Sequence, residues 1–190
     1  MLTTELLLSA YRQGVFPMAD DRGEIGWYFP ERRGLIPLDE RFHIPHGLRR
    51  VLKKNRFAVT ADRDFAGVIG ACATAHGRTW ISPEIKHAYL ALHYAGYAHS
   101  IEAWLGDRLV GGLYGVHIGG VFFGESMFHH ATDASKVALV ALVDRLRGSN
   151  FLLLDTQWIT PHLATFGAVE VTPAYYLRLL KKALARDCVF

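Results

Sequence analysis

Two carboxylates that follow apolar runs are the residues of this sequence best suited to chemistry. Glu125 comes after the apolar residues 121–123, and Asp155 comes after the apolar residues 151–154. A carboxylate beside so much apolar surface has to be paired or polarised, because burying it alone is costly. Gln157 lies two residues beyond Asp155 and points the same way in an extended chain. Asp155 could therefore accept from the Gln157 amide and turn the Gln157 oxygen toward a cleft.

Each acid also has a plainer interpretation. Glu125 could be an exposed residue at the end of a strand, and Asp155 could be a solvated strand end whose side chain caps a helix. An acid at the carboxyl end of a buried strand is nevertheless a common place for a functional group in α/β sheets. Both acids, together with Gln157, are therefore candidate catalytic residues.

A basic cluster in residues 47–56 is a candidate for contact with a polyanion. Five cations within eight residues cannot all find partners locally, and cations that neutralise a nucleic-acid backbone release its counterions. The plainer alternative is the solvated face of an amphipathic helix. The cations are Arg49, Arg50, Lys53, Lys54 and Arg56.

Several large apolar residues could form a pocket for a hydrophobic side chain, since such pockets combine an apolar lining with few polar groups. The alternative for each of them is an ordinary place in the core. The candidates are Trp80, Trp104, Phe122, Phe123, Met127 and Phe128.

Neither a metal nor a cofactor is expected. The ten histidines give no HExxH motif, and neither the pair 129–130 nor the spacing of His43 and His46 has a carboxylate or cysteine to complete a metal site. The glycine pairs 111–112 and 119–120 are better interpreted as strand and turn glycines than as a dinucleotide fingerprint.

The composition is that of a globular protein with a substantial core. The chain has 190 residues, of which 51% are hydrophobic and 21% charged, with a formal net charge of +3. That charge is too small to indicate nucleic acid by itself. No apolar run approaches the roughly 20 residues that a membrane span needs, and no secretory signal is visible, so a cytoplasmic location is expected. Cys72 and Cys188 lie too far apart to indicate a disulfide scaffold.

The elements that must position these residues alternate between helices and strands, which indicates a mixed α/β protein. Ser82, Thr160 and Thr172 each precede a proline, a combination typical of helix starts. Residues 14–47 are irregular or form short strands, and three later strands form an antiparallel meander. The predicted helices cover residues 2–13, 47–55, 64–75, 82–96, 132–147, 160–167 and 172–183, and the predicted strands cover residues 56–60, 98–105, 109–118, 121–125, 151–155 and 169–171.

Seven short motifs, spread over nearly the whole chain, resemble in sequence and order those of the bacterial leucyl/phenylalanyl-tRNA–protein transferases. Each motif alone is weak, but together they are highly specific. They are Tyr11-Arg12-Gln13-Gly14-Val15-Phe16-Pro17, Thr79-Trp80-Ile81-Ser82-Pro83, Ala98-His99-Ser100-Ile101-Glu102, Leu109-Val110-Gly111-Gly112-Leu113-Tyr114-Gly115, Phe123-Gly124-Glu125-Ser126-Met127-Phe128, Ala134-Ser135-Lys136 and Leu154-Asp155-Thr156-Gln157.

The resemblance implies an aminoacyltransferase. Such enzymes take Leu, Phe or Met from an aminoacyl-tRNA and join it to the α-amine of a protein that begins with Arg or Lys, which marks that protein for N-degron degradation. The resemblance also implies a Gcn5-type acetyltransferase-like mixed sheet in a catalytic domain at residues 61–190, with the basic helix in a small N-terminal domain at residues 1–60. A monomer is expected, with aminoacyl-tRNA and acceptor proteins as partners and no membrane.

The resemblance further implies residue roles. Asp155 and Gln157 would activate the acceptor amine; Gln157 would orient it and relay charge to Asp155, because a neutral amide is a poor base. Glu125 would bind either the α-amine of the aminoacyl group or the cationic side chain of the acceptor. Trp80 would stack on the terminal adenine, and the cations of residues 49–56 would hold tRNA phosphates. The other substrate-binding residues would be Phe122, Gly124, Ser126, Met127 and Thr160.

Two positions depart from the family pattern. Met18 stands where many members carry Trp after Phe-Pro, and Thr160 stands where some carry Asn. The Gly-rich leader that usually precedes the first helix is expected to be absent. These departures concern the wall of the adenosine site and the acceptor subsite.

Three alternatives stay open. The terminal hydroxyl of the tRNA could handle the proton in place of protein groups. An acyl-CoA-dependent N-acetyltransferase would share the fold, but it would need a Gly-rich pyrophosphate loop that residues 129–135 lack. A tRNA-binding protein without transfer activity would explain the basic helix, but not Glu125, Asp155 and Gln157 together.

Overall fold

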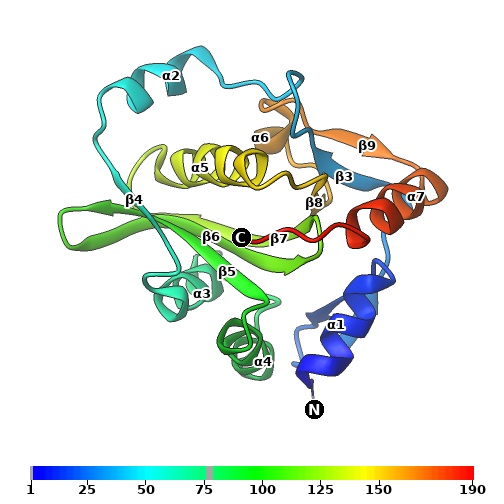
Figure 1. Ribbon diagram of the computed structural model, residues 1–190. Coiled ribbons are helices and arrows are strands. Elements are labelled where there is room, and N and C mark those ends of the chain that lie inside the picture. The colour runs from blue at the N-terminus through cyan, green and yellow to red at the C-terminus, as the bar shows by residue number, and fades with distance from the viewer. Residues whose placement is uncertain (1, 76–78) are drawn as a thin grey trace.

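The computed structural model describes residues 2–75 and 79–190 of the chain. Helices and strands are mixed along the whole sequence, which confirms the α/β class (Figure 1). The helices are α1 (Thr4–Arg12), α2 (His46–Lys53), α3 (Phe65–Thr74), α4 (Pro83–Tyr94), α5 (Ala134–Gly148), α6 (Pro161–Ala164) and α7 (Pro173–Leu184). The strands are β1 (Phe16–Ala19), β2 (Ile25–Tyr28), β3 (Arg33–Ile36), β4 (Ala58–Ala61), β5 (Ala98–Leu105), β6 (Arg108–Ile118), β7 (Val121–His129), β8 (Leu153–Gln157) and β9 (Val169–Val171).

A mixed sheet of seven strands, in the order β4-β5-β6-β7-β8-β3-β9, forms the centre of the fold. The strands from β4 to β7 pair antiparallel, β7 and β8 pair in parallel, and β3 pairs antiparallel with both β8 and β9. The predicted meander is β5-β6-β7. A small separate sheet holds β1 and β2.

Helices cover both faces of the large sheet. In Figure 1, α5 lies above the sheet with α2 outside it, whereas α3 and α4 lie below. The buried side chains divide in the same way. One cluster, which includes Tyr89 and Leu180, joins α1, α3, α4 and α7 to the sheet. The other cluster, which includes Leu48, Leu139 and Leu163, joins α2, α5 and α6 to it.

The segment before α2 enters the main sheet through β3. Gly34 pairs with Gln157 of β8 on one side and with Glu170 of β9 on the other. An early stretch of the chain therefore lies directly beside the strand that carries Asp155. The expected domain division at residue 60 stays a prediction, and these strand pairs cross it.

Side-chain caps begin three of the helices at the residues that the sequence predicted. Ser82, Thr160 and Thr172 each accept a hydrogen bond from the backbone N–H three residues further on. Asp133 is the N-cap of α5, but its backbone is left-handed, with φ of 68°, and its side chain makes no capping bond. Its carboxylate instead accepts from Lys136 Nζ at 2.7 Å.

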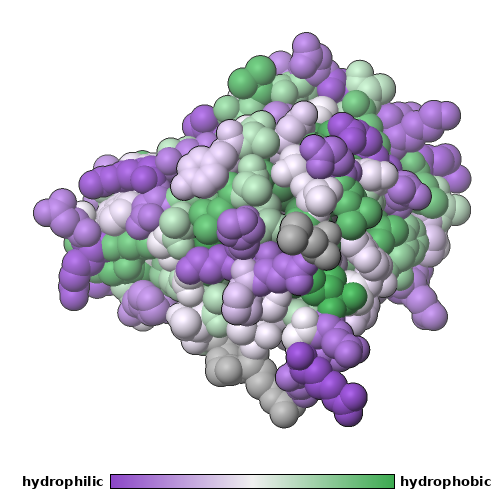
Figure 2. Space-filling model, turned by 90° about the horizontal axis from the view of Figure 1, so that it is seen from below, coloured by the Kyte–Doolittle hydropathy of each residue, from purple (hydrophilic) through white to green (hydrophobic). Residues whose placement is uncertain are grey.

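Among the residues described, no helix combines the length and the apolar character that crossing a membrane requires. Figure 2 shows the molecule from below the view of Figure 1. On that face hydrophilic side chains alternate with smaller apolar patches and do not leave one continuous apolar surface.

Candidate active site

β7 and β8 run side by side over a short parallel stretch and then separate. Their last paired residues are Phe123 and Asp155. Beyond this pair, β7 continues along β6 to His129, whereas β8 ends at Gln157. Side chains from both strands can therefore enter the space where the backbones part, and Glu125 and Gln157 both lie just past this point.

A β-bulge accommodates Glu125 inside β7. Tyr114 of β6 pairs with Ser126 and Gly115 pairs with Gly124, so Glu125 is an extra residue in its strand. A bulge re-aims a side chain without ending the strand. The sequence predicted a strand end at Glu125, and the bulge is the physical reason why the strand continues.

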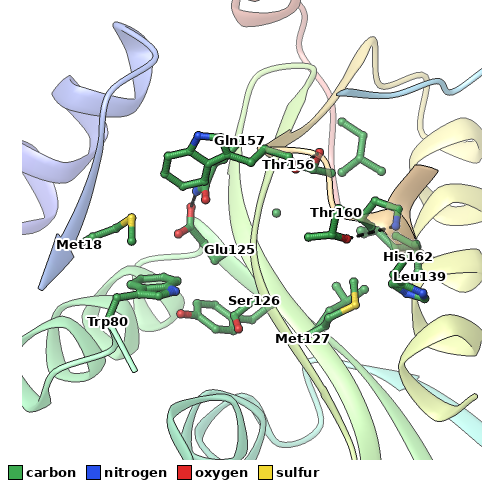
Figure 3. Close-up of a pocket in the computed structure, with 17 residues that line it drawn as sticks. Met18, Trp80, Glu125, Ser126, Met127, Leu139, Thr156, Gln157, Thr160 and His162 are labelled. Carbon is green, nitrogen blue, oxygen red and sulfur yellow. Dashed lines mark hydrogen bonds between the residues drawn. The ribbon is translucent and has the colours of Figure 1, made fainter. Parts of the chain in front are cut away.

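The parted strands border a cavity of about 250 Å³ with two unlike ends (Figure 3). Glu125 and Gln157 lie at one end, with Met18 and Trp80 beside them, and Met127 lies toward the other. The apolar wall consists of Leu113, Met127, Leu139, Leu142, Leu154 and Leu163. The cavity thus suits a ligand that joins a polar group to an apolar side chain.

Glu125 is 9% exposed and is held by three donors. Tyr11 Oη donates to Oε1 at 2.6 Å, Gln157 Nε2 donates to the same oxygen at 3.2 Å, and Tyr89 Oη donates to Oε2 at 3.3 Å. The two phenol oxygens also lie within hydrogen-bond distance of each other, and because each phenol has one proton, Tyr89 can donate either to Tyr11 or to Glu125. Burial raises the pKa of Glu125 to about 7 against the lowering effect of these bonds, so the carboxyl group can change its charge near neutral pH.

Asp155 is fully buried, and its two oxygens are occupied by protein donors. Arg33 donates to it from Nε at 2.9 and 3.0 Å and from Nη2 at 2.7 Å. Tyr176 Oη donates at 2.6 Å, and the backbone N–H of Gln157 donates at 2.8 Å. Asp155 therefore accepts from the Gln157 backbone and not from its side-chain amide, which donates to Glu125.

Gln157 ends β8 in an unusual conformation. Its backbone is left-handed, with φ of 65°, and the bond to Asp155 holds its N–H in place. The turn that follows packs against the backbone of Gly34, where an added Cβ would meet the carbonyl carbon of Trp158 at 2.7 Å. Because the side-chain nitrogen donates to Glu125, the side-chain oxygen is the atom left to accept from a ligand.

The structure brings most of the predicted substrate-binding residues to the cavity. Its lining includes Trp80, Gly124, Ser126, Met127 and Thr160. Asp155 is not part of the lining, although it fixes Gln157, which is. Phe122 also lies outside it, because its ring is fully buried and packs on Phe190 with the ring centroids 5.3 Å apart.

The basic cluster lies elsewhere. Arg49, Arg50 and Lys53 belong to α2, with Lys54 and Arg56 just after it, and all five side chains are exposed. Within residues 2–75 and 79–190, no carboxylate forms an ion pair with any of the five. Their charge is therefore available to solvent or to an anionic partner.

Sequence reasoning missed the residues that hold the acids in place. Arg33 is 1% exposed, donates from Nη1 to the Gly14 carbonyl at 2.8 Å and lies over the Tyr176 ring at 4.4 Å from its centroid. Tyr11 and Tyr89, whose hydroxyl groups contact the carboxylate of Glu125, were missed as well. The signal that could have found Arg33 is the need of a buried Asp155 for a cationic partner.

The described part of the chain was also searched for clusters of metal-ligating side chains. No group of three or more His, Cys, Asp or Glu side chains within it is arranged to hold a metal ion.

The mixed α/β fold has a two-ended cavity where two parallel strands part, and such a cavity suits a small group with one polar and one apolar end. Comparisons with known proteins narrow this class. The family model of the leucyl/phenylalanyl-tRNA protein transferases matches residues 35–181, and the model of their N-terminal domain matches residues 1–31.

Curated relatives agree with the family models. The leucyl/phenylalanyl-tRNA–protein transferase of Akkermansia muciniphila is 58% identical over 186 residues, which cover 96% of each chain. That of Herpetosiphon aurantiacus is 52% identical over 189 residues, which cover 100% of this chain and 98% of the relative. That of Zymomonas mobilis is 53% identical over 97% of this chain and 70% of its own. The chain belongs to the leucyl/phenylalanyl-tRNA protein transferase family.

Proposed function

We propose that this protein transfers Leu, Phe or Met from an aminoacyl-tRNA to the α-amine of proteins that begin with Arg or Lys, and so marks them for N-degron degradation. The observation that carries the proposal is the identity of more than half the residues, over nearly the full length, with enzymes named for the transfer of leucyl and phenylalanyl groups from tRNA to protein. Charged tRNA is a cytoplasmic substrate, and the protein acts there. A monomer stays the expectation.

The donor side chain occupies the apolar end of the cavity. Six Leu and Met side chains form its wall, and a volume of about 250 Å³ admits Leu, Phe or Met. A polar side chain would lose its hydration there without recovering hydrogen bonds, so it is rejected. Trp80, which lines the same cavity, stacks on the terminal adenine. Thr160 borders the subsite for the acceptor.

The reaction is aminolysis of an ester, and it moves one proton. The acceptor amine attacks the ester carbonyl carbon, the bond to the tRNA 3′-oxygen breaks, and the amine loses a proton while that oxygen gains one. Such a reaction needs alignment more than activation of an inert bond. Gln157 supplies alignment, since its side-chain oxygen is free to accept from the amine and fix its direction of attack.

Asp155 acts as a positioning residue. Arg33, Tyr176 and the Gln157 backbone together donate to both of its oxygens, so taking up a proton would break bonds that a buried arginine needs. It therefore holds Gln157 in its left-handed conformation. The proton of the amine passes instead to the departing 3′-oxygen of the tRNA, directly or through its neighbouring hydroxyl.

The α2 region holds the body of the tRNA. Arg49, Arg50, Lys53, Lys54 and Arg56 are exposed and contact phosphates, which positions the tRNA without reading its bases. Figure 1 shows α2 on the outside of α5, where a large partner can reach it.

The catalytic part takes a Gcn5-type acetyltransferase-like arrangement. The parting of the parallel strands β7 and β8 over the cavity supports this inference. The same fold serves acyl-CoA-dependent N-acetyltransferases, but the full-length matches to tRNA-dependent enzymes favour aminoacyl transfer.

The test is transfer of radiolabelled Phe from charged tRNA to a peptide that begins with Arg, compared with one that begins with Ala. Label is expected on the Arg peptide alone. Gln157→Ala should lose most of the transfer while tRNA binding persists. A wild-type protein that binds charged tRNA but transfers nothing would leave a tRNA-binding protein and refute the proposal.

A further inference from the structure

One face of the small β1–β2 sheet runs from the cavity to the surface of the molecule. Phe16 pairs with Tyr28, and Met18 pairs with Gly26, so these four positions lie on the same face of the two strands. Met18 lines the cavity, whereas the side chain of Tyr28 is 40% exposed. A ligand that extends out of the cavity past Met18 therefore meets Tyr28.

Two exposed aromatic rings are held in place along this route. The buried ring of Phe16 contacts Trp158 edge-on, with ring centroids 5.3 Å apart, and stacks on Tyr28, with ring centroids 6.3 Å apart. Tyr28 also lies across Gly26, where an added Cβ would stand 3.0 Å from Cε2 of its ring. Trp158 is 43% exposed and lines the cavity. Tyr28 and Trp158 together are called the aromatic platform below.

The position of the platform favours the acceptor polypeptide as its ligand. Under the proposed function, both a tRNA end and an acceptor chain extend from the cavity. The side-chain oxygen of Gln157 fixes the acceptor amine, and Trp158 is the next residue along the chain. The residues that follow the acceptor amine therefore start beside the platform.

The charge around the platform disfavours the tRNA. Residues 16–32 carry four acids and two arginines, all of them exposed, which gives this segment a formal net charge of −2. Such a surface repels phosphates and attracts an acceptor whose first residue is a cation. The cations of the α2 region lie elsewhere, since α1, which packs against β1, is on the opposite side of the molecule from α2 (Figure 1).

We propose that the aromatic platform binds the second and third residues of the acceptor polypeptide and gives the enzyme a preference for aromatic or large apolar side chains there. An apolar side chain that lies on the two rings is removed from water, whereas glycine gains nothing from them. This inference rests on the proposed function and deepens it, because it adds a second element of acceptor recognition to the N-terminal Arg or Lys.

Steady-state transfer of radiolabelled Phe to two peptides tests the platform. One peptide begins with Arg-Phe-Phe and the other with Arg-Gly-Gly, and both continue with the same polar sequence. The wild type should have the higher kcat/KM for the Arg-Phe-Phe peptide. Tyr28→Ala should reduce this preference about fivefold, which is the effect of one aromatic contact. The loss should appear in the KM of the Arg-Phe-Phe peptide and leave its kcat unchanged, because the contact is made equally before and during the reaction.

Two further variants serve as controls. Tyr28→Phe keeps the ring and should keep the preference. Tyr175→Ala removes a ring that is 46% exposed but belongs to α7 and lies outside the cavity lining, so it should leave the preference unchanged.

Three results would overturn the platform: no preference in the wild type, a preference that Tyr28→Ala leaves intact, or an equal loss for both peptides. An equal loss together with weaker tRNA binding would assign the platform to the tRNA end instead. If the wild type transferred Phe to neither peptide, the proposed function would be refuted and the platform's role with it. Transfer to both peptides with equal kcat/KM would refute only the platform.

Discussion

At the scale of single residues, the two buried acids of this protein have opposite environments and therefore different uses. Asp155 is matched by a buried arginine, whereas Glu125 is surrounded by uncharged donors. A carboxylate with a cationic partner keeps its charge, and one without such a partner gains a proton more readily. The first acid is suited to holding structure and the second to meeting a cationic substrate.

Glu125→Gln should make the protein more stable at pH 8. The folded protein raises the pKa of Glu125 from 4.5 to about 7, so this group contributes stability below about pH 4.5, which is lost as the pH rises through about 7. The cost of the ionised form is roughly 3 kcal/mol at most. Urea unfolding should show the variant to be more stable at pH 8 and nearly equal at pH 5. A gain that is the same at both pH values would contradict the assignment.

Asp155→Asn should destabilise the protein strongly. It leaves Arg33 buried without a counter-charge, and breaking a buried pair in this way costs about 3–5 kcal/mol. The control is Asp39→Asn, which breaks a pair with Arg41 whose side chains are 42% and 68% exposed. That change should cost less than about 1 kcal/mol. Equal unfolding midpoints for the two variants in urea would show that the Asp155 pair does not stabilise the fold.

The sequence indicated the two acids but not the residues that hold them in place. Glu125 and Asp155 stand out because each follows an apolar run, and Gln157 stands out because it lies two residues beyond Asp155; both are local patterns. Arg33 could not be found in this way, because its partner Asp155 is 122 residues away. A local pattern carries no information about a pair that only the closed sheet brings together.

At the scale of elements, the turn after β8 depends on how closely β3 approaches it. Gly34 lets the backbone of residues 157–159 lie against β3, since any Cβ there would meet Trp158 at 2.7 Å. The sequence indicated short strands in this region, but not that one of them would lie beside β8. The bulge at Glu125 was likewise missed, because it follows from the register between β6 and β7 and not from the residues of β7 alone.

Gly34→Ala should therefore reduce kcat. The added methyl group pushes the turn away and moves Gln157, and a misplacement of about 1 Å can cost on the order of 100-fold in rate. Steady-state transfer to an Arg peptide measures the effect. Gly148→Ala is the control, because nothing lies within 4 Å of its added Cβ, and its kcat should match the wild type. An unchanged kcat in Gly34→Ala would mean that the turn does not position Gln157.

At the scale of the whole molecule, the proposed function places the chemistry and the binding of the tRNA body in separate regions. The cavity lies where β7 and β8 part, and the cations of the α2 region lie outside α5 (Figure 1). A tRNA bound by its body at α2 must reach the cavity with its end. Changes to α2 should therefore affect the affinity for tRNA and leave the chemistry at the cavity intact.

Arg50→Gln combined with Lys53→Gln should weaken the salt dependence of tRNA binding. Each lost phosphate contact reduces the slope of log K against log salt by about 1, so the double variant should lose about 2. Filter binding between 50 and 200 mM salt would measure this slope. Lys181→Gln with Lys182→Gln on α7 is the control and should leave the slope unchanged. Identical slopes in the two double variants would place the tRNA elsewhere.

The residues that hold the two acids are made at different times during synthesis. Tyr11, Arg33 and Tyr89 leave the ribosome before either acid, and Tyr176, which completes the set around Asp155, is made after both. A nascent chain therefore holds a guanidinium and two phenols that wait for partners not yet translated. Because Tyr176 belongs to α7, the hydrogen bonds around Asp155 can be completed only after nearly the whole chain has been made.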